Sequence, residues 1–347
     1  MKIGSHHIGR DQPPCIIAEM SGNHNQSLDR ALEIVEAAAG VGAHALKLQT
    51  YTADTMTLNV DAPGFRIEDK ESPWFGRTLY ELYEEAHTPW EWHRPIMEKA
   101  RGLGIICFST PFDETAVDFL EELEVPAYKI ASFENTDLPL IRKVAATGKP
   151  IIISTGMATL AELDETVRIL RDCGHKDFVL LKCTSTYPAS PENSNVLTIP
   201  HMREMFDCEV GLSDHTMGVG AAAAAVAHGA TVVEKHFTLN RADGGVDAAF
   251  SLEPEELRQL VTETERAWKS LGRVQYGPTP AEISSIQFRR SLFVVRDMKA
   301  GDEFTDNNVR IIRPGMGLAP KYLAKILGRS ASIDLEKGMP IKWEYVQ

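Results

Sequence analysis

Two pairs of polar side chains stand two residues apart within otherwise apolar stretches of the sequence. Lys47 and Gln49 lie in Ala-Leu-Lys-Leu-Gln, and Glu234 and His236 lie in Val-Val-Glu-Lys-His. Residues two apart on a β-strand face the same side, so each pair presents both side chains to one surface. A lysine between leucines is costly to bury unless it meets an anion or a carboxylate. The pattern therefore indicates an anion site at Lys47 or, alternatively, a structural ion pair with a glutamate on a neighbouring strand.

A second lysine and several hydroxyl groups occupy similar positions. Lys129 lies in Ala-Tyr-Lys-Ile, and hydroxyl side chains end or follow other apolar runs at Thr110, Ser132, Ser154 and Ser213. Any one such serine is more often a turn former or a helix cap. Together with two lysines, however, these hydroxyls suggest a cradle for phosphate and carboxylate groups.

The charge balance favours a small molecule as the ligand of this cradle. Asp and Glu outnumber Lys and Arg by 49 to 36, which gives a formal net charge of −13. That charge opposes the electrostatic attraction on which binding to nucleic acids and to anionic lipid depends. We expect neither a nucleic-acid nor a membrane partner.

Eight short β-prone runs, separated by helical segments, carry the polar residues at or after their ends. They are Cys15–Ala18, Ala45–Gln49, Ile105–Ser109, Ala127–Ile130, Pro150–Ser154, Phe178–Lys182, Glu209–Leu212 and Thr231–Lys235. Eight β/α units in about 270 residues predict a closed (β/α)8 TIM barrel, whose strand ends converge on one face. A doubly wound sheet is less compatible, because no Gly-rich dinucleotide fingerprint follows the first run. The polar residues are therefore expected to share one mouth.

Two histidines in this mouth predict a metal site. His215 follows the seventh strand and His236 ends the eighth, while Glu19 follows the first strand, which closes against the eighth. One histidine alone is more often a hydrogen-bonded structural residue, but two neutral imidazoles that converge make a divalent metal plausible. With no third histidine or thiolate nearby, an open octahedral Mn²⁺ or Mg²⁺ is favoured over structural zinc.

The remaining pattern predicts a substrate loop and a second domain. The sizeable insertion Tyr51–His87 follows the second strand, on the face where barrel enzymes bind substrate, and is rich in apolar and aromatic residues. We place the barrel at residues 1–275, ending in a helix over Pro254–Leu271, and a linker at residues 276–288. A small β-rich domain is expected at 289–347, with strand-like pieces at Ser291–Val295, Val309–Ile312 and Ser332–Ile333.

Cysteine usage and the N-terminus predict a cytoplasmic protein. The five cysteines are scattered without a C-x-x-C pair, so neither a disulfide framework nor a thiolate zinc site is expected. The N-terminal residues contain no apolar signal region, and the longest apolar stretch is far shorter than a membrane-spanning helix requires.

A resemblance to the sialic acid synthase family extends over nearly the whole chain. It is carried by the runs IIAEMSGNHN, LKLQTYTADT, FSTPFD, AYKIASFEN, IISTGMA, CTSTYP, GLSDHT and VEKHFTLN, and by RPGMGL near the C-terminus. Members of this family condense phosphoenolpyruvate with a hexose derivative to give a nine-carbon 2-keto-3-deoxy acid. The runs LKLQTYTADTMTL and LYELYEEAHTPWEWH look most like the branch that makes pseudaminic acid from 2,4-diacetamido-2,4,6-trideoxy-altrose. N-acetylneuraminate and legionaminate synthases are the alternatives.

The resemblance also implies roles for individual residues. Phosphoenolpyruvate would be held by Lys47, Thr110, Lys129, Ser132, Ser154, Ser185, Tyr187 and Ser213, although related N-acetylneuraminate synthases tend to carry Asn at the position of Ser185. Metal would be bound by His215 and His236, with Glu19 as the acid/base carboxylate. Gln49, Glu134 and Asp247 would contact sugar hydroxyls or a metal-bound water, and Arg313 would reach the sugar. The last segment resembles the antifreeze-like (SAF) module, which family members use as a swapped lid over the barrel of a partner in a homodimer.

Two functions of other classes remain as alternatives. A Schiff-base aldolase would use Lys47 or Lys129 as its nucleophile and would need no metal. A C-terminal module that binds ice or another protein, with the barrel as a scaffold, is disfavoured because residues 291–347 offer few regularly spaced hydroxyls.

Overall fold

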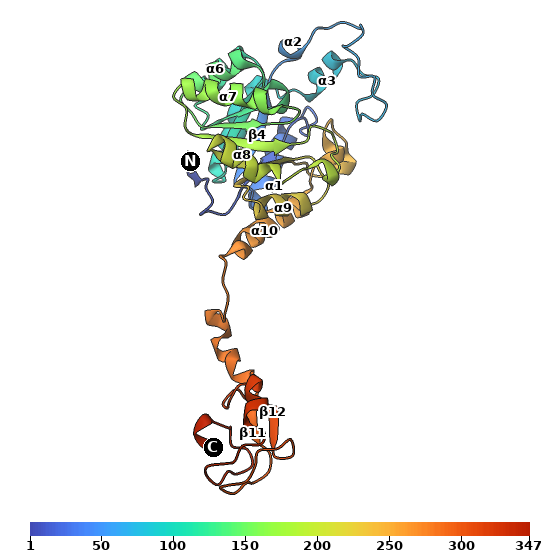
Figure 1. The fold of residues 1–347 in the computed structure, drawn as a ribbon. Coiled ribbons are helices and arrows are strands. Elements are labelled where there is room, and N and C mark those ends of the chain that lie inside the picture. Colours follow the sequence, from blue (N-terminus) through green and yellow to red (C-terminus); the bar gives the residue numbers. More distant parts are fainter. The chain divides into compact units, whose positions relative to one another are not determined.

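The computed structural model describes residues 1–347, which form two compact units, Met1–Gly272 and Arg273–Gln347 (Figure 1). Each unit has a hydrophobic core of its own. None of the helices combines the length and the apolar character that crossing a bilayer requires.

The first unit is a closed barrel of eight parallel strands, which confirms the predicted fold class. The strands are β3 (Cys15–Glu19), β4 (Ala45–Thr50), β5 (Ile106–Pro111), β6 (Tyr128–Ile130), β7 (Ile151–Ser154), β8 (Phe178–Cys183), β9 (Glu209–Asp214) and β10 (Val232–His236). Each of them overlaps a run predicted from the sequence. Closure pairs β10 with β3, and the register places His236 opposite Glu19 and Glu19 opposite Lys47. Three polar side chains from consecutive strands therefore stand in one row.

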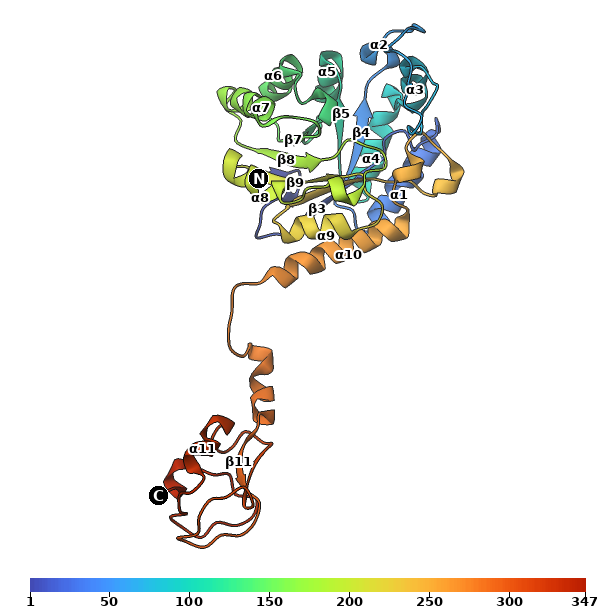
Figure 2. The same ribbon diagram turned by 45° about the vertical axis from the view of Figure 1, so that its right-hand side comes forward.

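Helices surround the barrel (Figure 2). They are α1 (Leu28–Gly40), α4 (His93–Gly102), α5 (Glu114–Glu122), α6 (Leu138–Ala146), α7 (Leu160–Asp172), α8 (Thr198–Phe206), α9 (Gly220–Ala227) and α10 (Pro254–Leu271). Local capping fixes several of their starts. At α7, Glu162 N donates to Thr159 Oγ1 at 3.3 Å while Thr159 N donates to Glu162 Oε2 at 2.7 Å, which satisfies two otherwise orphaned amide groups.

An N-terminal hairpin closes the end of the barrel opposite the predicted mouth. It consists of β1 (Lys2–Ile3) and β2 (His6–His7), and the sequence analysis did not predict it. Ile3 and Ile8 of this segment pack in one cluster with the barrel residues Ile17 and Phe108. Two-residue strands are too short to show an alternating pattern, which is why the hairpin was missed.

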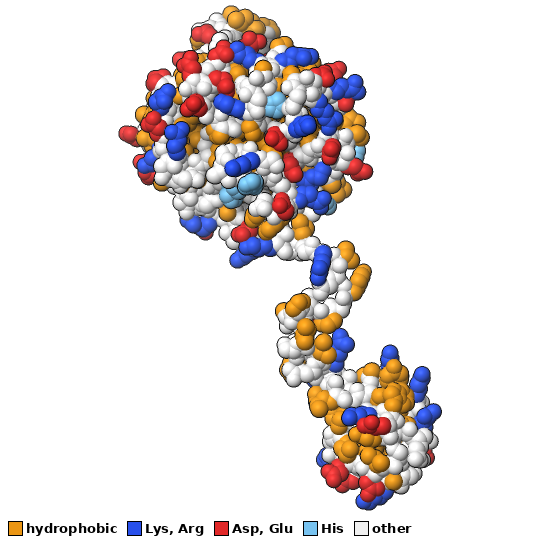
Figure 3. Space-filling view, turned by 90° about the vertical axis from the view of Figure 1, so that its left-hand side faces the viewer, with side chains coloured by type: hydrophobic (Ala, Val, Ile, Leu, Met, Phe, Trp, Pro, Cys, Tyr) orange, Lys and Arg blue, Asp and Glu red, His pale blue; other side chains and the backbone are white.

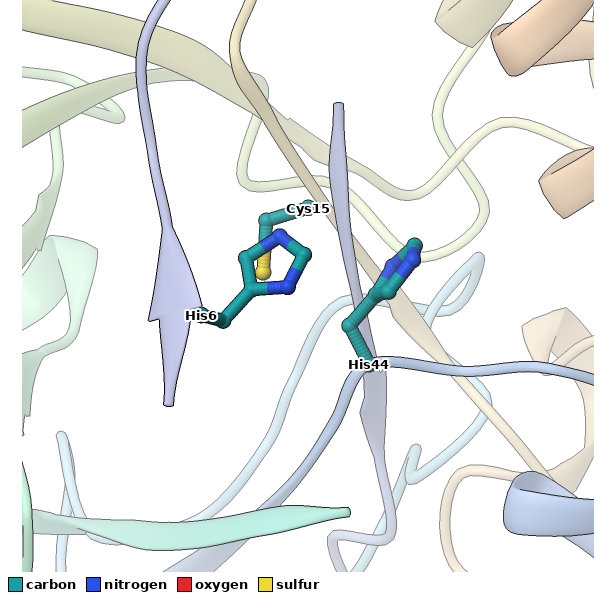
Figure 4. Close-up of side chains that lie close together, drawn as sticks. All are labelled: His6, Cys15 and His44. Atoms are coloured by element: carbon teal, nitrogen blue, oxygen red, sulfur yellow. The ribbon is translucent and has the colours of Figure 1, made fainter. Parts of the chain in front are cut away.

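Three potential metal ligands meet where this hairpin contacts the barrel. Figure 4 shows His6, Cys15 and His44 gathered there. His44 Nδ1 accepts a hydrogen bond from Ile16 N at 2.9 Å, so the neutral ring carries its proton on Nε2 and has no free lone pair. Burial also raises the pKa of the Cys15 thiol to about 12. We therefore interpret the group as a packing contact, in which the rings of His6 and His44 lie 4.7 Å apart.

The insertion after β4 contains two short helices, α2 (Ala53–Met56) and α3 (Leu79–Ala86). Each begins with a threonine cap, Thr52 for α2 and Thr78 for α3. The intervening residues are mostly irregular.

The second unit packs an antiparallel pair, β11 (Ser291–Val294) and β12 (Val309–Ile312), with the short helix α11 (Leu323–Ile326). Its core includes Phe304 and Ile341. One expectation needs correction. Residues 332–333 form a bend between isolated bridges rather than a strand. The chain changes direction there because the carboxylate of Asp334 accepts a hydrogen bond from Ala300 N at 2.9 Å.

Part of the segment assigned to the linker has regular structure. Residues Pro280–Phe288 form a 3-10 helix. Its start is fixed by Thr279, whose backbone N–H donates to Glu282 Oε2 at 2.8 Å. The sequence analysis did not predict this helix, because the region is rich in proline, glycine and serine, which are typical of turns.

Candidate active site

The carboxyl ends of the barrel strands surround a cavity of about 460 Å³. Twelve of the residues singled out in the sequence line it: Glu19, Lys47, Gln49, Lys129, Ser132, Glu134, Ser154, Tyr187, Ser213, His215, His236 and Asp247. Eight buried side-chain nitrogen and oxygen atoms in the structure have no hydrogen-bond partner. Three of these, on Glu134, Glu234 and His236, line this cavity, and a fourth, on Thr110, stands beside the cavity residue Gln49 in the strand register. Since native proteins rarely leave such groups unpaired, the concentration is typical of a ligand site.

Lys47 is the centre of a buried charge cluster. Its Nζ lies 2.9 Å from Glu234 Oε1 and 3.0 Å from Glu19 Oε1. Gln49 Nε2 donates to the same Glu19 oxygen at 2.8 Å. Burial alone would raise the pKa of Glu19, but Lys47 and His236 outweigh it and hold this pKa well below its usual range. The ion pair considered as an alternative for Lys47 is thus present, and it lies in the cavity wall.

Lys129 and the hydroxyls form the part of the cavity floor that adjoins this cluster. Lys129 Nζ donates to Ser154 Oγ at 2.6 Å and lies 3.5 Å from Glu234 Oε1. Burial lowers the pKa of Lys129, although Glu234 opposes this effect. Gly156 N donates to Ser132 Oγ at 3.1 Å. These groups offer two ammonium ions and several hydroxyls to a small anion.

The absence of a side chain at Gly156 keeps this floor open. A Cβ atom at that position would collide with the hydroxyls of Ser132 and Ser185. Ser185 therefore lies beside the cradle although it does not line the cavity, and its Oγ is 3.6 Å from Cys183 Sγ.

The two histidines fit the requirements of a metal site. Their ring centroids are 5.3 Å apart. His215 Nδ1 donates to Thr184 O at 2.9 Å, which leaves the Nε2 lone pair available, and His236 Nδ1 is buried without a partner. The cavity is also lined by five carboxylates, Glu19, Asp69, Glu134, Glu234 and Asp247, against two lysines. This surplus of negative charge suits a divalent cation, and oxygen-rich surroundings suit Mn²⁺ or Mg²⁺.

Two groups in the mouth were not singled out by the sequence. Ser21 donates to Asp247 Oδ2, and Cys183 lines the cavity. Glu234, which the spacing to His236 placed in the mouth without a role, accepts from both Lys47 and Ser213. Nothing in the sequence indicates that Ser21 and Asp247, 226 residues apart, form a hydrogen bond.

Glu134 differs from the other carboxylates of the mouth. Burial raises its pKa to about 7, although Lys129 opposes the shift, and its Oε2 has no partner. It can therefore hold or release a proton near neutral pH.

The insertion forms an apolar roof over the charged floor. Its cavity-lining residues are Tyr51, Met56, Ile67, Asp69, Ser72, Trp74, Leu79, Leu82, Tyr83 and Ala86. Trp74 connects this roof to the barrel, because its Nε1 donates to Val246 O at 2.8 Å.

Two further predicted residues lie away from the cavity lining. Thr110, on β5, is buried beside Gln49 in the strand register, and its hydroxyl has no partner. Arg313 belongs to the second unit and directly follows β12.

Fold and site together define a barrel synthase of the kind that the motifs indicated. The model of the NeuB family matches residues 34–276, and that of the SAF domain matches residues 289–347. The chain belongs to the NeuB family and carries a C-terminal SAF domain.

Individual relatives cover nearly the full chain. Pseudaminic acid synthase of Campylobacter jejuni is 44% identical over 99% of this chain and 98% of its own. Pseudaminic acid synthase of Helicobacter pylori is 42% identical over 97% and 98%. Among solved structures, the N-acetylneuraminic acid synthetase of Leptospira borgpetersenii in complex with citrate superimposes with a TM-score of 0.73 at 33% identity. That superposition covers 83% of this chain and 95% of the other.

Proposed function

We propose that this chain is a pseudaminic acid synthase. It condenses phosphoenolpyruvate with 2,4-diacetamido-2,4,6-trideoxy-altrose and water to give pseudaminic acid and phosphate. The observation that carries the proposal is the sequence identity of 42 to 44% to pseudaminic acid synthases over nearly the whole chain. The cavity supports it, because a charged floor and an apolar roof suit a small dianion and a deoxy sugar respectively.

The cavity floor is proposed to bind phosphoenolpyruvate. Lys47 and Lys129 supply the positive charge, and Ser132, Ser154 and Ser213 supply hydroxyl donors. Lys47 would then exchange part of its contact with Glu19 and Glu234 for the substrate anion, which frees the Glu19 carboxylate toward the reacting carbons. Thr110 and Ser185 complete the same anion site.

The reaction forms one carbon–carbon bond and replaces one carbon–oxygen bond at C2 by another. C3 of phosphoenolpyruvate attacks the sugar aldehyde carbon, and the aldehyde oxygen takes up a proton and becomes a hydroxyl. Water adds at C2 and loses a proton, and the resulting tetrahedral intermediate loses its second proton as it expels phosphate with the bridging oxygen, which leaves the 2-keto group. Glu19 is proposed to act as the base that takes a proton from this water. It is ionised in the cavity, and it becomes more basic when the substrate anion draws Lys47 away from it. Gln49 orients the carboxylate through the hydrogen bond that it donates to Oε1.

His215 and His236 are proposed to hold Mn²⁺ or Mg²⁺. When bound, such an ion polarises the aldehyde oxygen as a Lewis acid. The hydrogen bond from His215 Nδ1 to Thr184 O fixes the tautomer that directs Nε2 to the ligand. Asp247, held by Ser21, and Glu134 are proposed to contact sugar hydroxyls.

The SAF domain is proposed to cover the barrel of a partner subunit and to bring Arg313 to the sugar. Several of its large hydrophobic side chains and those of the preceding segment are exposed, including Tyr276, Ile283, Phe288 and Met316 (Figure 3). Exposed apolar groups of this size favour a docking surface. The five free cysteines are consistent with a reducing compartment, and we propose the cytoplasm.

The deciding experiment measures phosphate release from phosphoenolpyruvate with three sugars, the altrose derivative, 2,4-diacetamido-2,4,6-trideoxymannose and N-acetylmannosamine. The altrose derivative should give the highest kcat/KM. Equal or faster turnover of N-acetylmannosamine would refute the assignment and favour an N-acetylneuraminate synthase, whereas preference for the mannose derivative would favour a legionaminate synthase. Trapping of a covalent adduct by borohydride would point to the Schiff-base aldolase.

A further inference from the structure

We propose that Trp74 determines which sugar the cavity accepts, because its indole forms the wall against which the deoxy carbon C6 of the substrate packs. The inference rests on the proposed function and adds a specificity-determining residue to it.

Trp74 is held firmly at the mouth although it lies in an irregular part of the insertion. Its Nε1–H donates to Val246 O at 2.8 Å. Its ring centroid lies 5.8 Å from that of Tyr187 and 6.2 Å from that of Phe250. These partners come from the loops after β8 and β10. The insertion is therefore fastened to the opposite rim of the barrel, and the position of the indole is fixed before substrate binds.

The side chains that the insertion contributes to the cavity are mostly apolar, in contrast to the charged floor. Besides Trp74 they include Met56, Ile67, Leu79 and Leu82. The polar side chains that the insertion adds to the lining besides the tyrosines are Asp69 and Ser72. The Trp74 donor is already used by Val246 O, so the indole offers no hydrogen bond to a ligand.

An indole face that offers no hydrogen bond distinguishes a methyl group from a hydroxymethyl group. A hydroxyl placed against the indole loses water and gains no partner, whereas a methyl group in the same place only buries apolar surface. Pockets of this kind discriminate substrates that differ by one small group by about 10- to 200-fold in kcat/KM. The proposed substrate carries a methyl group at C6, which is the position where ordinary hexosamines carry a hydroxyl.

The test uses a substrate pair that differs only at C6, the trideoxy altrose derivative and its 6-hydroxy counterpart. The measured quantity is the ratio of their kcat/KM values in phosphate release. In Trp74→Ala the ratio should fall at least about tenfold relative to wild type. In Trp74→Phe, which keeps an aromatic wall and loses the bond to Val246 O, the ratio should stay within about threefold while KM rises for both sugars.

Two further variants make the outcome interpretable. Phe75→Ala changes an exposed neighbour, 51% exposed and outside the cavity lining, and should leave the ratio unchanged. Trp74→Gln adds a group that can pair with the 6-hydroxyl and should lower the ratio as Trp74→Ala does, so the test survives if one variant folds poorly.

Different experimental results would overturn the proposed function and the inference about Trp74. A wild-type enzyme that releases no phosphate with the trideoxy altrose derivative contradicts the proposed function. A wild-type enzyme that prefers this sugar, combined with Trp74→Ala and Trp74→Gln variants that slow both sugars equally, overturns the role of Trp74 alone.

Discussion

Lys47 Nζ lies 2.9 Å from Glu234 Oε1, although the two residues stand on β4 and β10, which are separated in the barrel by β3. The intervening strand contributes Glu19, whose Oε1 is 3.0 Å from the same nitrogen. One ammonium group thus joins three consecutive strands and compensates two buried carboxylates. This arrangement makes Lys47 important for stability as well as for the proposed anion binding.

Replacement of Lys47 by Met should destabilise the barrel by about 3–5 kcal/mol, because it removes the cation nearest to two buried carboxylates and leaves Lys129, 3.5 Å from Glu234 Oε1, as the remaining buried lysine beside them. Urea unfolding of the barrel transition measures the effect. Arg168→Met, which breaks an exposed pair with Asp164 on α7, is the control and should leave the midpoint unchanged. A Lys47→Met variant as stable as wild type would show that the carboxylates do not depend on this ion pair.

Changing either His215 or His236 to Ala should abolish tight Mn²⁺ binding and turnover together. Binding of the metal alone, measured by titration calorimetry, separates this effect from a loss of chemistry. Phosphoenolpyruvate binding should largely survive, since it depends on the lysines. His201→Ala, at an exposed histidine on α8, is the control. Full activity after exhaustive chelation, or unchanged metal affinity in both variants, contradicts the assignment.

Stability should fall as the pH drops from about 6.5 to about 4. Burial lowers the pKa of His24, His44 and His93 to about 4 each, whereas a histidine in the unfolded chain titrates near 6.5. Between these values the unfolded state binds more protons, so acidification favours unfolding. The contribution of these three neutral histidines to the free energy of unfolding is fully present above pH 6.5.

The measurement is urea unfolding of the barrel transition at several pH values, for wild type and for His44→Asn. The variant removes one of the three histidines, so its free energy of unfolding should fall less steeply through this window. Identical slopes for the two proteins would mean that His44 titrates normally in the folded state.

Mixing two inactive variants should restore activity if the SAF domain covers a partner barrel. Chains with Arg313→Ala and chains with His236→Ala are expected to be inactive alone. After subunit exchange, half of the dimers are mixed, and in each of these one site receives both residues from unmutated chains. The mixture should therefore regain about a quarter of the wild-type rate. No recovery despite demonstrated exchange would place Arg313 over its own barrel or outside the site.

The barrel could be predicted from the sequence because polar residues stand at or near the ends of its apolar strand segments. Each of the eight apolar runs is short and contains, or is directly followed by, a polar residue, such as Lys129 or His236, so the strand pattern and the placement of the polar residues indicated the same fold. The same logic brought twelve candidate residues to one cavity.

What escaped prediction depends on contacts without a local pattern. The hydrogen bond from Trp74 to Val246 joins residues 172 apart, and the hairpin at Lys2–His7 is held by packing on the barrel floor. The position of Ser185 behind Gly156 follows from how two loops meet. Such relationships are properties of the assembled barrel, and no single segment encodes them.

The closed barrel floor has a kinetic consequence. The N-terminal hairpin packs against Ile17 and Phe108 at that end, so we expect ligands to exchange with solvent through the mouth. A molecule seated on Lys129 lies beneath any molecule held under the roof of the insertion. The deeper ligand must therefore arrive first and depart last, so steady-state turnover should follow a compulsory order, with the anion loading ahead of the sugar.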